Sequence, residues 1–168
     1  KELLKKAGYD EKHPFKFEIV TSNSSPVRPY AAEILQHQLK KAGVIVTLRV
    51  MEWQAFLNMV VFPHKFDAVL LGWGLSPTPD PYLFWHTDSD KKGGFNLVGY
   101  NNPKINKMIE ESQSIIDRDK LAKIWQEMFQ IIADDDPYLF LFIPNSITAV
   151  NKNIKHIEIA IENYQQFS

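Results

Sequence analysis

The side chains best suited to bind a small molecule follow a short apolar run at residues 68–71. Trp73 offers an aromatic ring for stacking, Ser76 offers a hydroxyl and Asp80 offers a carboxylate. Aromatic side chains with a few polar groups are typical of ligand pockets. Proline fixes φ and has no amide hydrogen, so three prolines stiffen this stretch: Pro77, Pro79 and Pro81. The sequence therefore predicts a rigid loop with binding chemistry.

Gly74 and Leu75 complete this predicted binding loop, because a glycine lets a ligand approach the backbone closely. Each residue of the loop also has a structural interpretation. Trp73 fits a core tryptophan at the end of a strand, and Gly74 fits an ordinary turn. For Asp80, which lies between two prolines, we favour the structural role of accepting hydrogen bonds from loop amides.

A second polar group, residues 22–25, precedes a predicted helix. Ser25 is the expected N-cap of that helix and Pro26 its first residue. Unpaired amides at a helix N-terminus favour an anion such as a carboxylate. Asn23 and Arg28 are the more plausible groups of a binding cleft, and Arg28 is able to pair with a ligand carboxylate. The alternative is that Arg28, in the first turn of the helix, is solvated surface.

The sequence gives little support for metal binding or for catalysis. The sequence has no cysteine, which excludes disulfides, iron–sulfur clusters and thiol catalysis. His86 with Asp88, and the acidic run 134–136, do not supply the several converging ligands that a divalent ion needs. No nucleophile elbow, phosphate loop, dinucleotide fingerprint or zinc-protease motif is present. We predict no catalytic residue, metal or cofactor; the enzymatic alternative is a small α/β hydrolase using His86 with Asp80 or Asp88.

The elements that must position these residues alternate in the first half of the chain. Strands are predicted at 15–20, 44–50 and 67–71, with helices between them, which indicates a parallel sheet with right-handed crossovers. The apolar third strand is expected to be central and covered on both faces. The binding loop would then leave its carboxyl end, the edge at which open α/β sheets bind ligands.

The second half is predicted to begin with an irregular surface excursion at 84–102. Helices are expected from Asn102 to Ile116 and from the cap Asp117 to the acidic run. The most apolar strand is predicted at 138–143, a further strand at 147–150 and a polar tail at 151–168.

The bulk composition narrows the function class. The 168 residues carry 19 basic and 20 acidic side chains, a formal net charge of -1, which argues against nucleic acid as a partner. No apolar run approaches the 18 or so residues of a membrane span. The chain begins at Lys1, in what reads as the end of a helix, so we expect a piece of a longer chain whose targeting signal lies elsewhere.

Several ordered pieces of the sequence resemble the solute-binding proteins of peptide and nickel ABC transporters, the extracellular solute-binding protein family 5. They are LLKKAGY at 3–9, AEILQHQLKKAGV at 32–44, EW at 52–53, FD at 66–67, GWG at 72–74, PDP at 79–81 and GYNNP at 99–103. The resemblance covers essentially the whole chain and is closest to the family's C-terminal lobe. It implies an α/β fold with a three-layer mixed sheet flanked by helices, one lobe of a type II periplasmic-binding protein, formed by residues 1–168.

The resemblance also implies a site and partners. Together with the groups identified from the residues themselves, it gives these expected ligand contacts: Trp73, Gly74, Leu75, Ser76, Asp80, Asn23 and Arg28. In peptide binders of the family, the residue three positions after this tryptophan is often an aspartate that pairs with the ligand's amino terminus. Here that residue is Ser76, which cannot form an ion pair. Sugars, opines and nickel complexes therefore remain open beside peptides.

The implied protein is a non-enzymatic receptor of an ABC importer. Its partners would be a peptide or small-molecule ligand, a missing N-terminal lobe and a transporter permease. It would be periplasmic or extracellular, as a lipoprotein or a secreted protein. The alternative from another class is a sensory or signalling domain of the same fold, and the full-length gene would distinguish the two.

Overall fold

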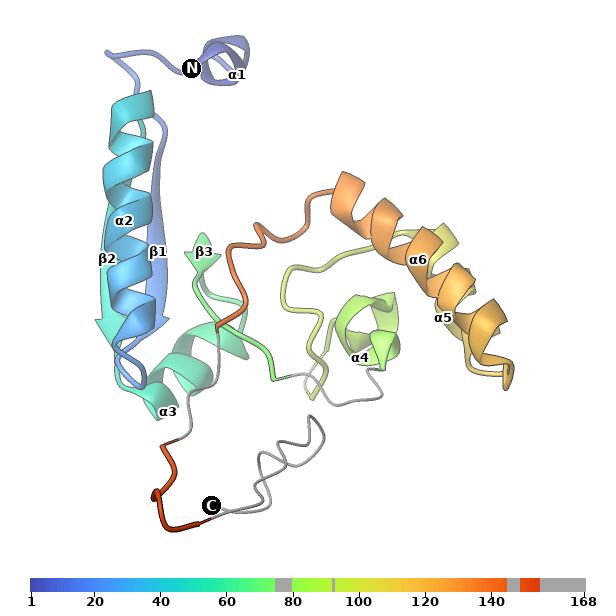
Figure 1. Cartoon of the computed structure of the whole chain (residues 1–168). Coiled ribbons are helices and arrows are strands. Elements are labelled where there is room, and N and C mark those ends of the chain that lie inside the picture. The colour runs from blue at the N-terminus through green and yellow to red at the C-terminus, as the bar shows by residue number, and fades with distance from the viewer. Residues whose placement is uncertain (75–79, 92, 145–148, 155–168) are drawn as a thin grey trace. The chain divides into compact units, whose positions relative to one another are not determined.

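The computed structural model describes residues 1–74, 80–91, 93–144 and 149–154 of the chain (Figure 1). The chain divides into two compact units, Lys1–Trp73 and Gly74–Ser168. Each unit has its own cluster of buried apolar side chains. That residues 1–168 form a single lobe stays a prediction.

The first unit is built on a three-stranded parallel sheet in the order β2-β1-β3. Its strands are β1 (Lys16–Ser22), β2 (Ile45–Met51) and β3 (Ala68–Val69). β1 pairs with β2 along its whole length, and Ile19 of β1 lies opposite Ala68 of β3. The predicted α/β class with parallel strands is confirmed. The sheet expected from the resemblance is mixed, whereas the three described strands all run parallel.

β3 is an edge strand of the described sheet, so the prediction that it is central and covered on both faces is wrong. β1 takes that place, because it has ladder partners on both sides; Val20 and Ser22 have no exposed surface. The residues of β3 are only half-buried. Past β3, Leu70 N donates to the Val20 carbonyl at 2.9 Å, and Thr21 Oγ1 donates to the Leu70 carbonyl at 2.9 Å.

The helices of the first unit are α1 (Glu2–Lys6), which precedes β1, α2 (Val27–Ala42), which links β1 to β2, and α3 (Trp53–Phe56) with the π-helix η1 (Leu57–Val61), which lie between β2 and β3. A glycine after a helical run predicts the end of the helix, and α2 does end at its C-cap Gly43, whose φ of 94° suits a glycine. The predicted start of α2 is wrong: Pro26 is the N-cap rather than the first helical residue, and no described side chain, that of Ser25 included, caps the helix.

The core of the first unit lies between α2 and the sheet, with α2 running across β1 and β2 (Figure 1). It contains Ile19, Ala32, Val44 and Val46. Successive strand residues point to opposite faces. Because Val20 is as buried as its neighbour Ile19, both faces of β1 are covered, and α3 also contacts β1.

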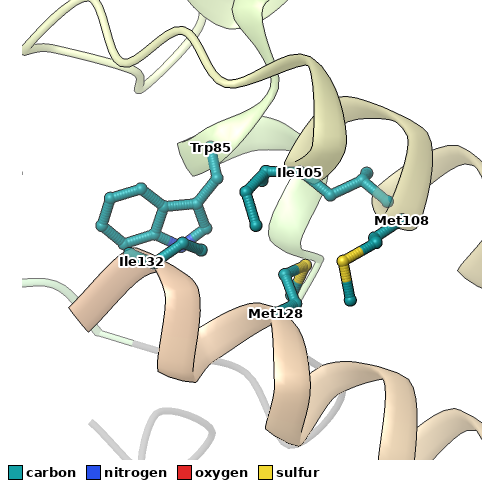
Figure 2. Packing of buried hydrophobic residues seen from close by; sticks show 6 residues of the cluster. Trp85, Ile105, Met108, Met128 and Ile132 are labelled. Atoms are coloured by element: carbon teal, nitrogen blue, oxygen red, sulfur yellow. The ribbon is translucent and has the colours of Figure 1, made fainter. Parts of the chain in front are cut away.

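The second unit is helical in its described residues, with α4 (Pro81–Trp85), the 3₁₀ turn η2 (Thr87–Ser89), α5 (Pro103–Ser112) and α6 (Arg118–Asp134). The predicted helix starts are confirmed, because the side chains of Asn102 and Asp117 cap α5 and α6. The end predicted for α5 is four residues too late. Figure 2 shows the core side chains facing one another: Trp85, Ile105, Met108, Met128 and Ile132.

The segment 84–102, predicted as a surface excursion that could include a short turn of helix, does contain the turn η2 and exposed residues, but part of it is buried. Asn96 has no exposed surface. Its Nδ2 donates to the carbonyls of His86 (3.2 Å) and Tyr100 (2.8 Å), and its Oδ1 accepts from Tyr100 N at 2.8 Å. The polar composition did not reveal the buried part, because one asparagine satisfies several backbone groups of an irregular loop and so allows that part to lie in the interior.

The strand predicted at 138–143 is also wrong for this structure: the segment has no regular structure, and most of its side chains are exposed, with Ile143 at 94%. A strand needs a hydrogen-bonded neighbour, and none of the described residues supplies one. Of the strand predicted at 147–150, residues 149 and 150 are not in a strand and the other two lie outside the described residues. The tail from residue 155 onward lies outside them too.

Candidate functional site

The carboxyl edge of the parallel sheet gathers the polar residues of the first unit. β1 ends at Ser22, which lies opposite Met51 at the end of β2. β3 runs parallel to β1, so the chain leaves β3 toward the same edge, and Trp73 follows four residues after Val69. In open α/β sheets this edge is where ligands bind.

Arg28 is the centre of a small polar cluster at this edge, which we call the Arg28 cluster: Ser22, Ser24, Arg28 and Trp53. The Arg28 Nη1 donates to Ser24 Oγ at 2.8 Å and to Ser22 Oγ at 3.2 Å. The two serine hydroxyls are themselves hydrogen-bonded at 2.9 Å. The guanidinium carbon lies 5.3 Å from the centre of the Trp53 ring, within reach of a cation–π interaction.

Local sequence explains why these side chains meet. Ser24 and Arg28 are four residues apart across the start of α2, and Ser22 ends the buried strand β1. Trp53 begins α3 directly after β2, where Glu52 caps the helix through Oε2, which accepts from Gln54 N at 2.8 Å and Ala55 N at 3.1 Å. These two hydrogen bonds lower the pKa of Glu52, so its carboxylate remains ionised on the helix end.

The predicted site residues fall in different places. Arg28 is half-buried within the cluster, and Asn23 is exposed beside it, its backbone N donating to the Met51 carbonyl at 2.9 Å. Trp73 is half-buried at the end of the first unit, and Gly74 is exposed. Leu75 and Ser76 lie outside the described residues.

Asp80 has the structural role that the sequence favoured. Its Oδ1 accepts from Tyr82 N at 2.9 Å and caps α4.

Sequence reasoning missed Trp53 as a member of the polar cluster, because its helical spacing with Phe56 and Val60 indicates a core residue. The sequence did contain a signal for the Arg28 cluster itself: the hydroxyl-bearing residues Ser22 and Ser24 lie six and four positions before Arg28.

His86 does not form the catalytic pair of the hydrolase alternative. It is buried, and its Nδ1 accepts from the backbone N of Asp88 at 3.1 Å. Its Nε2 lies 3.3 Å from Glu110 Oε1, and its ring stacks on Tyr82 with centroids 4.2 Å apart. Both ring nitrogens are thus occupied, and Asp88 offers His86 a backbone amide rather than its carboxylate.

The acidic run at the end of α6 has structural contacts. Asp135 Oδ2 accepts from Tyr100 Oη at 2.6 Å and from Asn102 Nδ2 at 2.9 Å, and these bonds lower the pKa of Asp135. Burial, followed by the bond to Asp135, raises the pKa of Tyr100 to about 12. Within the described ranges, no group of three or more His, Asp or Glu side chains is arranged to hold a metal ion.

The chain can now be compared with known proteins. Residues 1–95, more than half of the chain, match the model for the middle region of the bacterial extracellular solute-binding proteins, family 5. This chain belongs to that family. The family resemblance predicted from the ordered sequence pieces is therefore confirmed. No helix in the described segments of this family 5 protein is both long and apolar enough to cross a membrane.

Relatives of known name cover the chain nearly end to end. The oligopeptide-binding protein AppA of Bacillus subtilis (strain 168) is 34% identical over 166 residues, 92% of this chain and 30% of AppA. The nickel-binding protein NikA of Staphylococcus aureus is 25% identical over 163 residues, 96% of this chain and 33% of NikA. The chain thus spans about a third of the length of these relatives, which are binding proteins rather than enzymes.

Solved structures of the same relatives confirm the type II periplasmic-binding-protein fold. AppA from Bacillus subtilis, in complex with a nonapeptide, superposes with a TM-score of 0.70 and 38% identity over 74% of this chain and 25% of that one. NikA from Staphylococcus aureus, in complex with Ni(L-His)2, gives a TM-score of 0.70 at 24% identity over 81% of this chain and 29% of that one. At that identity the second comparison concerns the fold alone.

Proposed function

We propose that this chain is the C-terminal lobe of an ABC-importer receptor that binds an oligopeptide or a similar small solute between two lobes. The observation that carries the proposal is the similarity to the oligopeptide-binding protein AppA over 92% of the chain. The polar groups at the carboxyl edge of the sheet support it, because they lie where this fold class binds ligands. The receptor would act without catalysis.

The proposed ligand-contacting residues are those predicted from the sequence: Arg28, Asn23, Trp73, Gly74, Leu75 and Ser76. Arg28 and Asn23 are both at the carboxyl edge of β1 and β2. Asp80 was included in the predicted site, but its carboxylate already accepts a bond from Tyr82 N. We therefore assign Asp80 the role of holding the start of α4.

Ligand binding would close the two lobes, because only the closed state makes all contacts to the ligand at once. The permease would then recognise the closed receptor. The family is described as extracellular, and we propose a lipoprotein or secreted location outside the cytoplasmic membrane, where a permease accepts its solute. On this proposal one lobe alone supplies about half of the contacts, so the isolated chain binds ligand weakly.

Calorimetry can test the proposal with defined probes. The full-length receptor that contains this chain, and the chain alone, are titrated with oligo-alanine free acids of two to nine residues and with nickel chloride plus L-histidine. We expect saturable binding of at least one peptide length by the full-length receptor and little heat with the chain alone. Tight peptide binding by the chain alone would contradict the two-lobe site, and binding of the nickel–histidine mixture but of no peptide would contradict the peptide assignment.

A further inference from the structure

The third strand, β3, is only two residues long, yet the chain that leaves it leads to Trp73. In a parallel sheet the backbone groups of a middle strand face its two neighbours alternately. Asn23 N, directly after β1, donates to the Met51 carbonyl of β2, so Val20 and Ser22 face the β3 side. A ladder this short holds β3 weakly, and the bonds at its two ends therefore decide where the chain runs.

At its amino end β3 is held by a side chain. Glu18 N donates to Asp67 Oδ2 at 3.0 Å, and Asp67 directly precedes Ala68, the first residue of β3. A carboxylate oxygen thus accepts the bond that a backbone carbonyl would accept in a longer ladder. Asp67 is exposed, so this bond lies at the surface and marks where β3 begins.

At its carboxyl end β3 is held by a second side chain, that of Thr21. Leu70 N still donates to the Val20 carbonyl at 2.9 Å, as in a parallel ladder. If the ladder continued, the Leu70 carbonyl would accept from Ser22 N, and the described residues contain no such bond. The carbonyl accepts from Thr21 Oγ1 at 2.9 Å instead. The backbone ladder therefore ends at Leu70, and a hydroxyl closes it.

The Thr21 hydroxyl is itself fixed in place. Thr21 is only 1% exposed, and it lies in β1, the middle strand of the described sheet. A β-branched side chain is stiff at χ1, so its oxygen has little freedom to move. The Leu70 carbonyl is thus held by a rigid, buried donor.

The anchor at Leu70 is important because the residues beyond it include two glycines. Gly72 and Gly74 flank Trp73, both are exposed, and a Cβ added at either would meet nothing within 4 Å. Glycine has more backbone freedom than any other residue. The direction in which the chain leaves β3 is set two residues before Gly72, and it therefore limits where the Trp73 ring can lie.

We propose that Thr21 is a positioning residue for ligand binding: its hydroxyl fixes the Leu70 carbonyl and so holds Trp73 where it contacts the solute. The inference rests on the proposed function, in which Trp73 is a ligand contact, and adds a residue that acts without touching the ligand. A segment held before the ligand arrives loses less conformational entropy on binding. Without the hydroxyl, only the fraction of receptors with Trp73 in place binds, which lowers the apparent affinity by that fraction.

Variants of Thr21 test this role in the full-length receptor. Thr21→Val replaces the hydroxyl by a methyl group, and Thr21→Ser keeps a hydroxyl. Calorimetry with the tightest-binding oligo-alanine free acid should show an affinity about 2- to 10-fold weaker in Thr21→Val, the range to which the net contribution of one hydrogen bond corresponds. Thr21→Ser should retain most of the wild-type affinity.

Asp67→Ala is the matched control, because it removes the side-chain bond at the other end of β3. Each variant loses one hydrogen bond of the first unit, and urea denaturation should show similar losses of stability. Only Thr21→Val should also weaken peptide binding, since Asp67 lies before β3 and Trp73 follows it. A loss of affinity that merely follows stability would appear in both variants.

A double-mutant cycle shows whether Thr21 acts through Trp73. In a Trp73→Ala background Thr21→Val should weaken binding no further, because the ring that it positions is absent, whereas independent roles would give additive losses. Hydrogen exchange of residues 70–74, followed by mass spectrometry, tests the anchor without a ligand. Exchange should be faster in Thr21→Val than in the wild type or in Asp67→Ala.

Three affinity results would overturn the inference. Wild-type affinity in Thr21→Val would remove the positioning role while leaving the proposed function intact. Equal losses in Thr21→Val and Asp67→Ala would give Thr21 a structural role, and additive losses with Trp73→Ala would separate it from Trp73. Binding of no peptide by the wild type would contradict the proposed function itself. The exchange rates then decide, since faster exchange confined to Thr21→Val keeps the anchor and unchanged exchange removes it.

Discussion

The two units of the chain use polar side chains in different ways. In the second unit, Asn96 and His86 are buried, and their nitrogen and oxygen atoms are bonded within the protein. In the first unit, the carboxyl edge of the sheet holds Arg28 through neutral serines, and among the described residues no acceptor is bonded to its Nε or Nη2.

This difference indicates how to separate structural from functional polar residues. A polar group whose donors and acceptors are all satisfied inside the protein stabilises the fold, and removing it leaves its partners unpaired. A charged group that is held in place but not neutralised gains new bonds only when a ligand arrives. Changes in the second unit should therefore alter stability, whereas changes at the Arg28 cluster should alter ligand selectivity.

The largest expected effect on stability comes from Asn96→Ala. The substitution leaves the carbonyls of His86 and Tyr100 and the amide of Tyr100 without their partner. We expect the free energy of unfolding to fall by about 3 kcal/mol, since each unsatisfied buried group costs about 1–3 kcal/mol. Urea denaturation of the protein measures this change.

The matched control for Asn96→Ala is Asn58→Ala, which removes an exposed asparagine from the π-helix. It should change the free energy of unfolding by less than about 0.5 kcal/mol. A similar, small effect of both substitutions would show that the loop 84–102 is not held by Asn96.

The sequence was sufficient for elements whose signals are local. Asp117 and Asn102 mark the starts of two helices, and Gly43 marks the end of α2, because capping depends on residues within one turn. The parallel sheet followed from the alternation of strands and helices. These predictions needed no knowledge of distant contacts.

The sequence was not sufficient to predict a segment whose structure or burial depends on contacts with other parts of the chain. An apolar run at 138–143 indicates a strand, but its state depends on a neighbour that the described residues do not contain. The burial of Asn96 depends on backbone groups ten and four positions away. At the candidate site, Arg28 and Asn23 were predicted from the residues, whereas Trp53 was not, because its approach to Arg28 joins two different helices.

A smaller effect is expected from Tyr100→Phe, and it depends on pH. The raised pKa of Tyr100, about 12, stabilises the folded state below about pH 10, and this contribution is lost as the pH rises toward 12. The lowered pKa of Asp135 stabilises the folded state above about pH 4 and is lost as the pH falls below that. Tyr100→Phe should therefore flatten both ends of the stability–pH profile.

The control for Tyr100→Phe is Tyr30→Phe, because Tyr30 is 65% exposed on α2. Thermal unfolding followed by circular dichroism from pH 3 to pH 12 records both profiles. Retention of the wild-type decline at both pH extremes in Tyr100→Phe would show that the bond between Tyr100 and Asp135 does not contribute to stability. Tyr30→Phe should reproduce the wild-type profile.

The smallest effect is expected from Glu18→Gln, which frees Arg49 from its acid partner. The two side chains are 32% and 42% exposed, so the loss should be under about 1 kcal/mol and should shrink at high salt. Arg49 then has no acidic partner within 4.0 Å among the described residues, and it lies within β2 rather than at the carboxyl edge. Because the ion pair lies away from that edge, the receptor should bind peptide as the wild type does. Urea denaturation at low and at high salt measures the stability change, and a loss that salt does not reduce would show that the pair stabilises the fold by packing rather than by charge.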